Sequence, residues 1–423
     1  MVPPRPTTLF EESEAQLNSS SPEDRSGSQR SSVRFPDSWA SVHFDLLRGL
    51  AAFFVLFSHW RNLLFIDYHQ VTGDHLLSAG FYILSAAGHQ SVIVFFVLSG
   101  YFIGGTVFRS LERNQWAWSS YLLRRIVRLW TVLIPALFLC LFWDRLGIHL
   151  RIAPDLYAGW GHSVMIQFDV SKVLSPRIFL GNLFFLQTIV SPIFGSDGAL
   201  WSLANEFWYY ILFPLALITF WPAQRKLNRF LCAALFVLAA RFIGANMLMD
   251  FPIWLAGVVL FKLPPPPLAP ASAKVLRIAA SFLYAPVFFG ILHLPGVGGL
   301  NADYLLTVVT MIYFWILLSA KDRYDFRARS VRVSRELARF SYSLYALHVP
   351  FLLFLAALTV RDSRWSPTPL HILAGLGILI AGLVYAYVIA FFTEFRTDAI
   401  RQRLAPLLGI ADAPPILPSN PLP

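Results

Sequence analysis

Three ionisable residues, His59, Glu206 and His348, stand inside stretches of otherwise apolar sequence. An ionisable side chain deep in a membrane helix costs a few kcal/mol to insert, so such residues commonly mark functional sites. A neutral imidazole can act as a general base or carry an acyl group, and the ordinary histidine pKa of about 6.5 suits both roles. Glu206 could orient an imidazole and fix its tautomer, as a carboxylate does in catalytic triads. A structural role stays open for each residue, because any of them could simply hydrogen-bond a neighbouring helix.

A cluster of arginines offers a second kind of chemistry. Arg124 and Arg128 are four residues apart and share a helix face, with Arg125 beside them. Guanidinium groups bind phosphates with two parallel hydrogen bonds, so the cluster could hold a phosphorylated ligand. The alternative is topogenic, since arginines at the cytoplasmic end of a span also set its orientation. Arg48 precedes His59 by eleven residues, a helical rise of about 16 Å, so one helix would join a cationic site to the histidine.

The third motif is Ser99-Gly100, within the apolar segment 94–102. Ser99 does not lie in a GxSxG elbow, so close packing of two membrane helices is the better interpretation of this pair of small residues. The two cysteines, Cys140 and Cys232, form no CxxC pair, and the sequence contains no HExxH or Walker A motif. We therefore expect no metal site and no nucleotide-binding fold.

The elements that must position these residues are membrane-spanning helices. Only 14% of the 423 residues are charged, against about 25% in soluble domains, and the mean hydropathy is +0.58. Lys and Arg outnumber Asp and Glu by 34 to 24, and basic cytoplasmic loops explain this excess before nucleic-acid binding does. Apolar runs predict about ten spans, at 45–66, 90–108, 122–143, 199–220, 229–245, 249–263, 275–294, 303–320, 339–360 and 370–393.

Loop charge predicts the orientation of this all-α, polytopic helical bundle. The segments 109–128, 222–229 and 321–339 and the chain after residue 395 are rich in basic residues, and ten spans place them all on the side of the N-terminus. We therefore expect both termini in the cytoplasm. Counting the short segment 177–193 as a span would reverse every later loop, so we expect that segment to be re-entrant or interfacial.

The composition divides the chain into three regions. Residues 1–40 are polar, rich in serine and proline and without the apolar core of a signal peptide, which predicts a disordered cytoplasmic tail. Residues 41–395 are expected to form the membrane domain, in which 144–198 is one large external loop. Residues 396–423 are expected to form a second cytoplasmic tail.

The motifs follow one another in a characteristic order between residues 45 and 395. The order is Asp45-Leu-Leu-Arg48 with His59, then Ser99-Gly100, then Arg124-Arg125-Ile-Val-Arg128, then Trp201-Ser202 with Glu206, and finally Tyr345 with His348. In this order and spacing the chain resembles the acyltransferase-3 family of integral membrane acyltransferases. The last span departs from the family's Glu-x-Pro ending, because Arg396 replaces the proline, and Phe207 stands where many members carry a second acid.

The resemblance implies O-acylation, commonly acetylation, of a glycan or glycoconjugate hydroxyl. It implies acetyl-CoA, or another acyl-CoA, as a cytosolic co-substrate and no permanently bound cofactor. The positions that carry over as catalytic are His59, Glu206 and His348. Those that carry over as donor-binding are Arg48, Arg124, Arg125 and Arg128. The supporting positions are Asp45, Ser99, Gly100, Trp201 and Ser202.

The expected partners are the acyl-CoA, a sugar or glycan acceptor and the lipid bilayer, with no nucleic acid. External aromatics such as Trp160 and Tyr157 could stack on the sugar. The resemblance implies a multi-pass protein of the bacterial inner membrane. The rival class is a proton-coupled transporter that uses His59, Glu206 and His348 as a relay. Many transporters contain inverted repeats with broken helices, and the sequence shows no convincing internal repeat.

Overall fold

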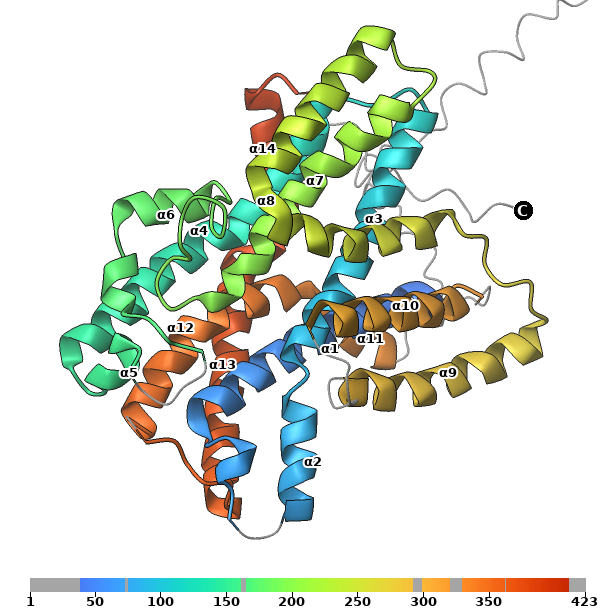
Figure 1. The fold of residues 1–423 in the computed structure, drawn as a ribbon. Coiled ribbons are helices and arrows are strands. Elements are labelled where there is room, and N and C mark those ends of the chain that lie inside the picture. Colours follow the sequence, from blue (N-terminus) through green and yellow to red (C-terminus); the bar gives the residue numbers. More distant parts are fainter. Residues whose placement is uncertain are drawn as a thin grey trace, which may run out of the picture. The chain divides into compact units, whose positions relative to one another are not determined.

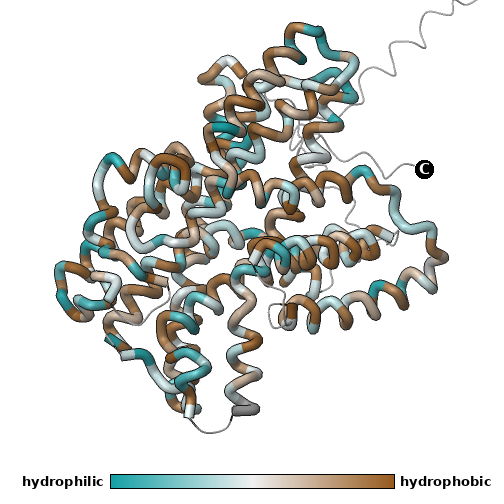
Figure 2. The backbone as a smooth tube through the Cα atoms, in the orientation of Figure 1, coloured by the Kyte–Doolittle hydropathy of each residue, from teal (hydrophilic) through white to brown (hydrophobic). Residues whose placement is uncertain are grey.

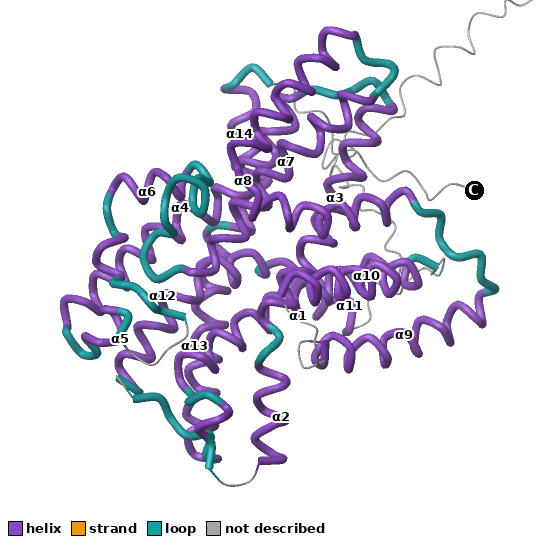
Figure 3. The backbone as a smooth tube through the Cα atoms, viewed as in Figure 1, coloured by secondary structure: helices purple, strands orange, loops and turns teal. Residues whose placement is uncertain are grey.

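The computed structural model describes residues 39–72, 75–160, 165–291, 299–319, 329–361 and 363–410. Within these ranges the regular structure is helical apart from two isolated β-bridges, which confirms the all-α prediction (Figures 1 and 3). Nearly all of the predicted N-terminal tail, residues 1–40, lies outside the described residues.

Nine helices in the described part of the chain are long and apolar enough to cross a membrane. The long helices are α1 (Trp39–Leu64), α3 (Gly88–Glu112), α4 (Trp118–Leu150), α7 (Trp201–Phe220), α8 (Lys226–Lys262), α9 (Pro270–Gly290), α10 (Gly299–Leu317), α12 (Ser341–Thr359) and α13 (Pro369–Phe392). The shorter ones are α2 (His75–Ser85), α5 (Pro154–Ala158), α6 (Pro176–Leu183), α11 (Arg329–Arg339) and α14 (Thr397–Leu407).

Helix α8 is broken sharply at Gly244, where φ is 80° and ψ is 173°. Residues with a side chain rarely adopt this conformation, so the break depends on glycine. The two arms of α8 coincide with the predicted spans 229–245 and 249–263. One broken helix in place of two separate ones accounts for the difference between ten predicted spans and nine helices.

The arms of α8 pack on different neighbours. The first arm runs back along α7, and Arg229 Nε donates to the Thr219 carbonyl oxygen at 2.9 Å. The second arm runs beside α3 and ends with Lys262 Nζ 3.1 Å from Glu112 Oε1. The chain therefore turns back at Gly244, as a pair of antiparallel spans would.

Several basic segments that were predicted to be cytoplasmic lie at one end of the bundle. The ring of Phe108, near the end of α3, lies 6.3 Å from the ring of Trp221, just after α7. Tyr342, at the start of α12, donates to the Leu129 carbonyl oxygen of α4 at 3.1 Å. This arrangement agrees with the loop-charge pattern, while the cytoplasmic orientation itself stays a prediction.

The segment predicted to be re-entrant or interfacial forms no spanning helix. Its helix α6 has eight residues and rises about 12 Å, whereas a bilayer core is about 30 Å thick. The polar side chains that interrupt the segment hold a compact loop together. Asn182 Nδ2 donates to the carbonyl oxygens of Ile178 and Pro192, both at 2.9 Å, and Gln187 Nε2 donates to the Leu200 carbonyl oxygen at 2.9 Å.

The predicted C-terminal tail contains a helix that the sequence analysis missed. Helix α14 packs against α4, and its Ala405 is fully buried. The helix is short, and Ala405 is its one buried residue. Its sequence therefore lacks the repeating apolar pattern that would have predicted a helix. Helix α2 was missed as well. The proposed boundaries at residues 40 and 395 stay predictions.

Figure 2 shows that hydrophobic residues predominate along the long helices, and many of their large apolar side chains are exposed. Phe230 on α8, Phe282 on α9 and Leu373 on α13 are each at least two-thirds exposed. Such a surface suits the hydrocarbon core of a bilayer, in which helices satisfy their own backbone hydrogen bonds. The chain is therefore an integral, multi-pass membrane protein.

Candidate functional site

Five helices bring the predicted site residues together. Helix α1 packs against both α3 and α12, α12 packs against α4, and α3 packs against α7. Between α4 and α7, the Tyr121 hydroxyl donates to the Tyr210 carbonyl oxygen at 2.9 Å. Every residue predicted to be catalytic or donor-binding lies on one of these helices.

The two predicted histidines are in direct contact. His59 Nδ1 on α1 lies 2.7 Å from His348 Nε2 on α12, and the two rings are nearly parallel. The other ring nitrogen of His348, Nδ1, lies 2.8 Å from the Leu344 carbonyl oxygen one turn earlier. His348 is fully buried, whereas His59 is half-buried. The pair therefore has one fully buried member and one that is partly exposed.

Glu206 belongs to a different polar group. Its Oε1 accepts from the Ser99 hydroxyl at 2.9 Å and from the Tyr210 hydroxyl, and Ser99 Oγ accepts from Trp254 Nε1 at 3.1 Å. Among the described residues no hydrogen bond joins Glu206 to His59. The partner of the His59 imidazole, which the sequence analysis expected to be Glu206, is instead His348.

The predicted donor-binding arginines face this group from α1 and α4. Arg48 pairs with Asp45 at 3.0 Å and lies over the ring of Phe102. Arg128 is exposed and lies within electrostatic range of both Glu206 and Arg48. Two cations held near one another suit an anionic ligand between them.

Arg125 and Arg124 complete the arginine cluster. The guanidinium of Arg125 lies over the rings of Tyr121 and Tyr210, at 5.5 and 5.8 Å from the ring centroids. Its Nε is buried without a hydrogen-bond partner among the described residues. Arg124 is half-buried on the same helix. Contacts with two rings limit where the Arg125 guanidinium can lie, and a guanidinium can bind a phosphate with two parallel hydrogen bonds.

Two supporting positions serve packing and one serves the polar group. A Cβ atom on Gly100 would lie 1.9 Å from the Trp254 carbonyl oxygen, so glycine permits the contact between α3 and α8. Trp201 packs edge-on against Phe96. The packing interpretation of the Ser99-Gly100 pair is therefore right for Gly100, while Ser99 joins the hydrogen bonds around Glu206.

The last supporting residue, Ser202, connects α7 to α12. Ser202 Oγ lies 2.6 Å from the Tyr345 hydroxyl, which also donates to the Ala199 carbonyl oxygen at 3.0 Å. Tyr345 lies one turn before His348. These bonds hold the first turn of α7 against the part of α12 that carries the histidine.

Sequence reasoning missed Glu394 as a site residue. Its Oε2 accepts from the Ser343 backbone N–H at 2.9 Å and from the Ser343 hydroxyl at 2.8 Å, and it lies within electrostatic range of Arg128. The first amide groups of a helix have no partner inside the helix, so Glu394 caps α12 from another element. The signal was present as Glu394-Phe-Arg396, which was read only as a departure from the family pattern.

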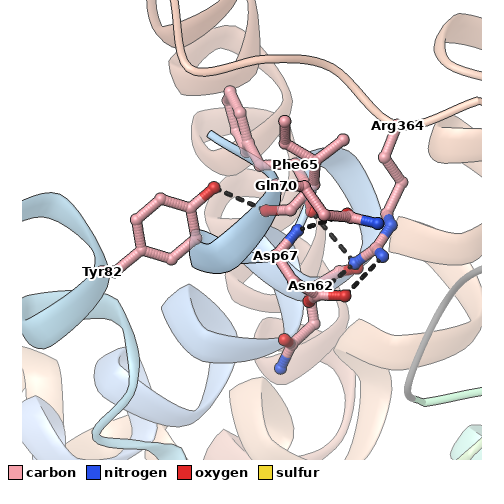
Figure 4. Close-up of polar contacts among 7 residues, drawn as sticks. Asn62, Phe65, Asp67, Gln70, Tyr82 and Arg364 are labelled. Atoms are coloured by element: carbon pink, nitrogen blue, oxygen red, sulfur yellow. Dashed lines mark hydrogen bonds and ion pairs between the residues drawn. The ribbon is translucent and has the colours of Figure 1, made fainter. Parts of the chain in front are cut away.

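Arg364, which the sequence analysis did not single out, braces the helix that carries His59 (Figure 4). Its Nη1 and Nη2 donate to the two oxygens of Asp67 at 3.1 and 2.8 Å, and Nη1 also donates to the Phe65 carbonyl oxygen at 3.1 Å. The Tyr82 hydroxyl donates to the neighbouring Ile66 carbonyl oxygen. These bonds satisfy backbone carbonyls just after the end of α1, six and seven residues beyond His59.

The two external aromatics have different surroundings. Trp160 is 82% exposed, so stacking on a sugar stays open for it. Tyr157 is only 4% exposed, because it packs against Gly147 of α4. A sugar cannot reach the ring of Tyr157, and that prediction is wrong. Within the described ranges, no group of three or more His, Cys, Asp or Glu residues could hold a metal ion.

Comparison with known proteins identifies the family. The sequence profile of the acyltransferase-3 family, an acyltransferase domain, matches residues 42–391. The match covers most of the chain, and the chain therefore belongs to the acyltransferase-3 family. An uncharacterised protein from Haemophilus influenzae is 26% identical over 160 residues, which is 36% of this chain and 60% of that relative. No solved structure matches the chain.

Proposed function

We propose that this membrane acyltransferase moves an acetyl group from cytosolic acetyl-CoA to a hydroxyl of a glycan or glycoconjugate. The observation that carries the proposal is the placement of Arg48 and His59 on one helix, about 16 Å apart along its axis. Arg128 lies near the first residue, and the second contacts His348. This separation suits a long donor whose phosphates and thioester are recognised at different depths.

The donor is held by the arginines. Coenzyme A carries phosphate groups at one end and the reactive thioester at the other. Arg48, Arg125 and Arg128 bind the phosphates at the basic end of the bundle, and Arg124 adds positive charge. The thioester then extends between the five helices toward His59. Two of the helices that line this path are α3 and α7. Glu206 of α7 is held there by hydrogen bonds from Ser99 of α3 and Tyr210 of α7.

Transfer proceeds by general base catalysis. Neutral His59 accepts the proton of the acceptor hydroxyl while the hydroxyl oxygen forms a bond to the thioester carbonyl carbon. The carbon–sulfur bond then breaks, and the coenzyme A thiolate takes the proton back from His59. The products are the O-acetylated acceptor and free coenzyme A, with no net release of a proton. The acceptor is reached from the extracytoplasmic face of a bacterial inner membrane.

The test uses purified protein in nanodiscs with acetyl-CoA labelled in the acetyl group, and glycans extracted from cells that lack the gene. Label should enter the glycan with the wild-type protein and with the control His149→Ala, an exposed histidine at the end of α4. His59→Ala should abolish transfer while donor binding persists. Retained turnover in His59→Ala would overturn the mechanism. Absence of any label in product, together with proton-dependent flux, would favour the transporter.

A further inference from the structure

The hydrogen bonds of the histidine pair determine which ring nitrogen of each histidine carries the proton. The role of this arrangement in the reaction rests on the proposed function. We infer that His348 is a positioning residue that fixes the tautomer of His59, so that Nε2 of His59 is the atom that takes the acceptor's proton. His348 itself exchanges no proton with the substrates. The backbone carbonyl of Leu344 anchors this chain of hydrogen bonds.

The chain of hydrogen bonds starts at Leu344. Its carbonyl oxygen can only accept, so the His348 nitrogen at 2.8 Å, Nδ1, carries the hydrogen. A neutral imidazole has one N–H group, which leaves Nε2 of His348 as an acceptor. His59 Nδ1 lies 2.7 Å from that acceptor, so Nδ1 of His59 must donate. The remaining nitrogen of His59, Nε2, then carries no hydrogen and has a free lone pair.

The neutral state of both rings follows from their surroundings. Among the described residues, no carboxylate is hydrogen-bonded to either ring, and His348 is fully buried. A charged imidazole there would be an unpaired buried charge, which is costly. Nε2 of His59 has no hydrogen-bond partner in the described part of the chain, yet it is not among the fully buried polar atoms, and the residue as a whole is half-buried. Nε2 is therefore the ring atom that a substrate hydroxyl can reach.

This arrangement controls the tautomer of the catalytic histidine, as a catalytic triad does, but with other chemical groups. In the serine hydrolases a carboxylate accepts the Nδ1–H of the catalytic histidine and keeps it in the productive tautomer. Here a second imidazole accepts that hydrogen, and the Leu344 carbonyl keeps the second imidazole in place. Glu394 caps the first turn of α12 at Ser343, five residues before His348, and so ties that turn to the segment that follows α13.

Three variants separate positioning from proton transfer. His348→Gln retains both hydrogen bonds, because the amide oxygen can accept from His59 and the amide nitrogen can donate to Leu344. Glutamine cannot act as a base. We expect His348→Gln to keep kcat within about tenfold of wild type and His348→Ala to lower kcat by about 10² or more, with KM for acetyl-CoA unchanged in both. His149→Ala is the matched control and should behave as wild type.

The tautomer is measured directly by ¹⁵N NMR of histidine-labelled protein in nanodiscs. In wild type and in His348→Gln, Nδ1 of His59 should be protonated and Nε2 should not. In His348→Ala the signals of His59 should move toward the opposite tautomer, and this result is expected even if the true acceptor is not a glycan. A wild-type His59 protonated at Nε2 would overturn the inference, as would equal loss of kcat in His348→Gln and His348→Ala.

Discussion

The guanidinium of Arg364 and the carboxylate of Asp67 form a two-point ion pair, with N···O distances of 3.1 and 2.8 Å. Arg364 is only 7% exposed as a side chain, so solvent screens this pair less than an ordinary surface pair. The pair joins the segment before α13 to the end of α1. It therefore fixes the axial position of the helix that carries His59.

Replacing Arg364 with lysine should weaken this brace. A lysine ammonium keeps the charge but cannot bind both carboxylate oxygens and the Phe65 carbonyl in the same fixed plane. We expect a loss of about 1–3 kcal/mol of stability, measured as a lower unfolding temperature, and a reduced kcat. Arg361→Lys, at an exposed site in the same segment, is the control. Equal effects of the two variants would show that the brace has no special role.

The same pair predicts an acid-sensitive component of stability. The hydrogen bond from Arg364 holds the pKa of Asp67 below its ordinary value. A folded-state pKa that is lowered contributes stability above the ordinary value, about 3.9, which is lost as the pH falls through the folded-state pKa. Unfolding temperatures of wild type and Asp67→Asn should therefore differ at neutral pH and converge below about pH 4. A constant difference at all pH values would contradict the assignment.

The sequence located the site residues along the helices better than it paired them. Apolar runs placed both His59 and His348 inside spans, and the structure keeps them there. Which residues touch depends on which helices are neighbours and on how each is rotated. Glu206 was therefore paired with the wrong group, although it lies inside a long apolar helix as predicted. Glu394 was missed because its role is to cap a helix that lies in another part of the chain.

The two buried carboxyl groups near the end of α4 should respond differently to amide substitution. Asp144 accepts from the Ser196 backbone N–H and the Ser196 hydroxyl, both at 2.7 Å, and from Cys140 at 3.3 Å. Asp144→Asn replaces an acceptor with a donor and should cost about 1–3 kcal/mol. Such a change should also loosen the segment before α7, which limited proteolysis would detect.

Asp197, by contrast, should tolerate asparagine. Burial, with the nearby charge of Asp144, raises the pKa of Asp197 well above its ordinary value. A raised folded-state pKa costs stability as the pH rises above the ordinary value, about 3.9. Asp197→Asn should therefore be at least as stable as wild type at pH 7, with the difference vanishing near pH 4. Thermal unfolding at both pH values measures this, and a clear loss of stability at pH 7 would contradict it.

The arginines should affect donor binding before they affect chemistry. Arg128→Ala removes an exposed guanidinium and should raise KM for acetyl-CoA by about tenfold or more, the loss of one charge-assisted interaction. Arg125→Lys keeps the charge but loses the planar guanidinium that can bind a phosphate through two hydrogen bonds, so it should also raise KM. Arg145→Ala, exposed on the far part of α4, is the control. If Arg128→Ala and Arg125→Lys left the affinity for acetyl-CoA unchanged, the arginine cluster would serve only to orient the helix in the membrane.

Gly100 tests whether helix packing positions the polar group around Glu206. A Cβ atom at residue 100 would lie 1.9 Å from the Trp254 carbonyl oxygen, which is backbone and cannot rotate away. Gly100→Ala must therefore separate α3 from α8, and Ser99 would lose its hydrogen bond from Trp254. We expect a loss of at least 1–3 kcal/mol, about the cost of an overpacked core. Gly377→Ala, on α13, has no atom within 4 Å of the new methyl group, so it should be neutral or stabilising by up to about 1 kcal/mol. Thermal unfolding of the two alanine variants tests this explanation. The contact with Trp254 should lower only the unfolding temperature of Gly100→Ala, whereas a general intolerance of alanine in these helices would lower both unfolding temperatures equally.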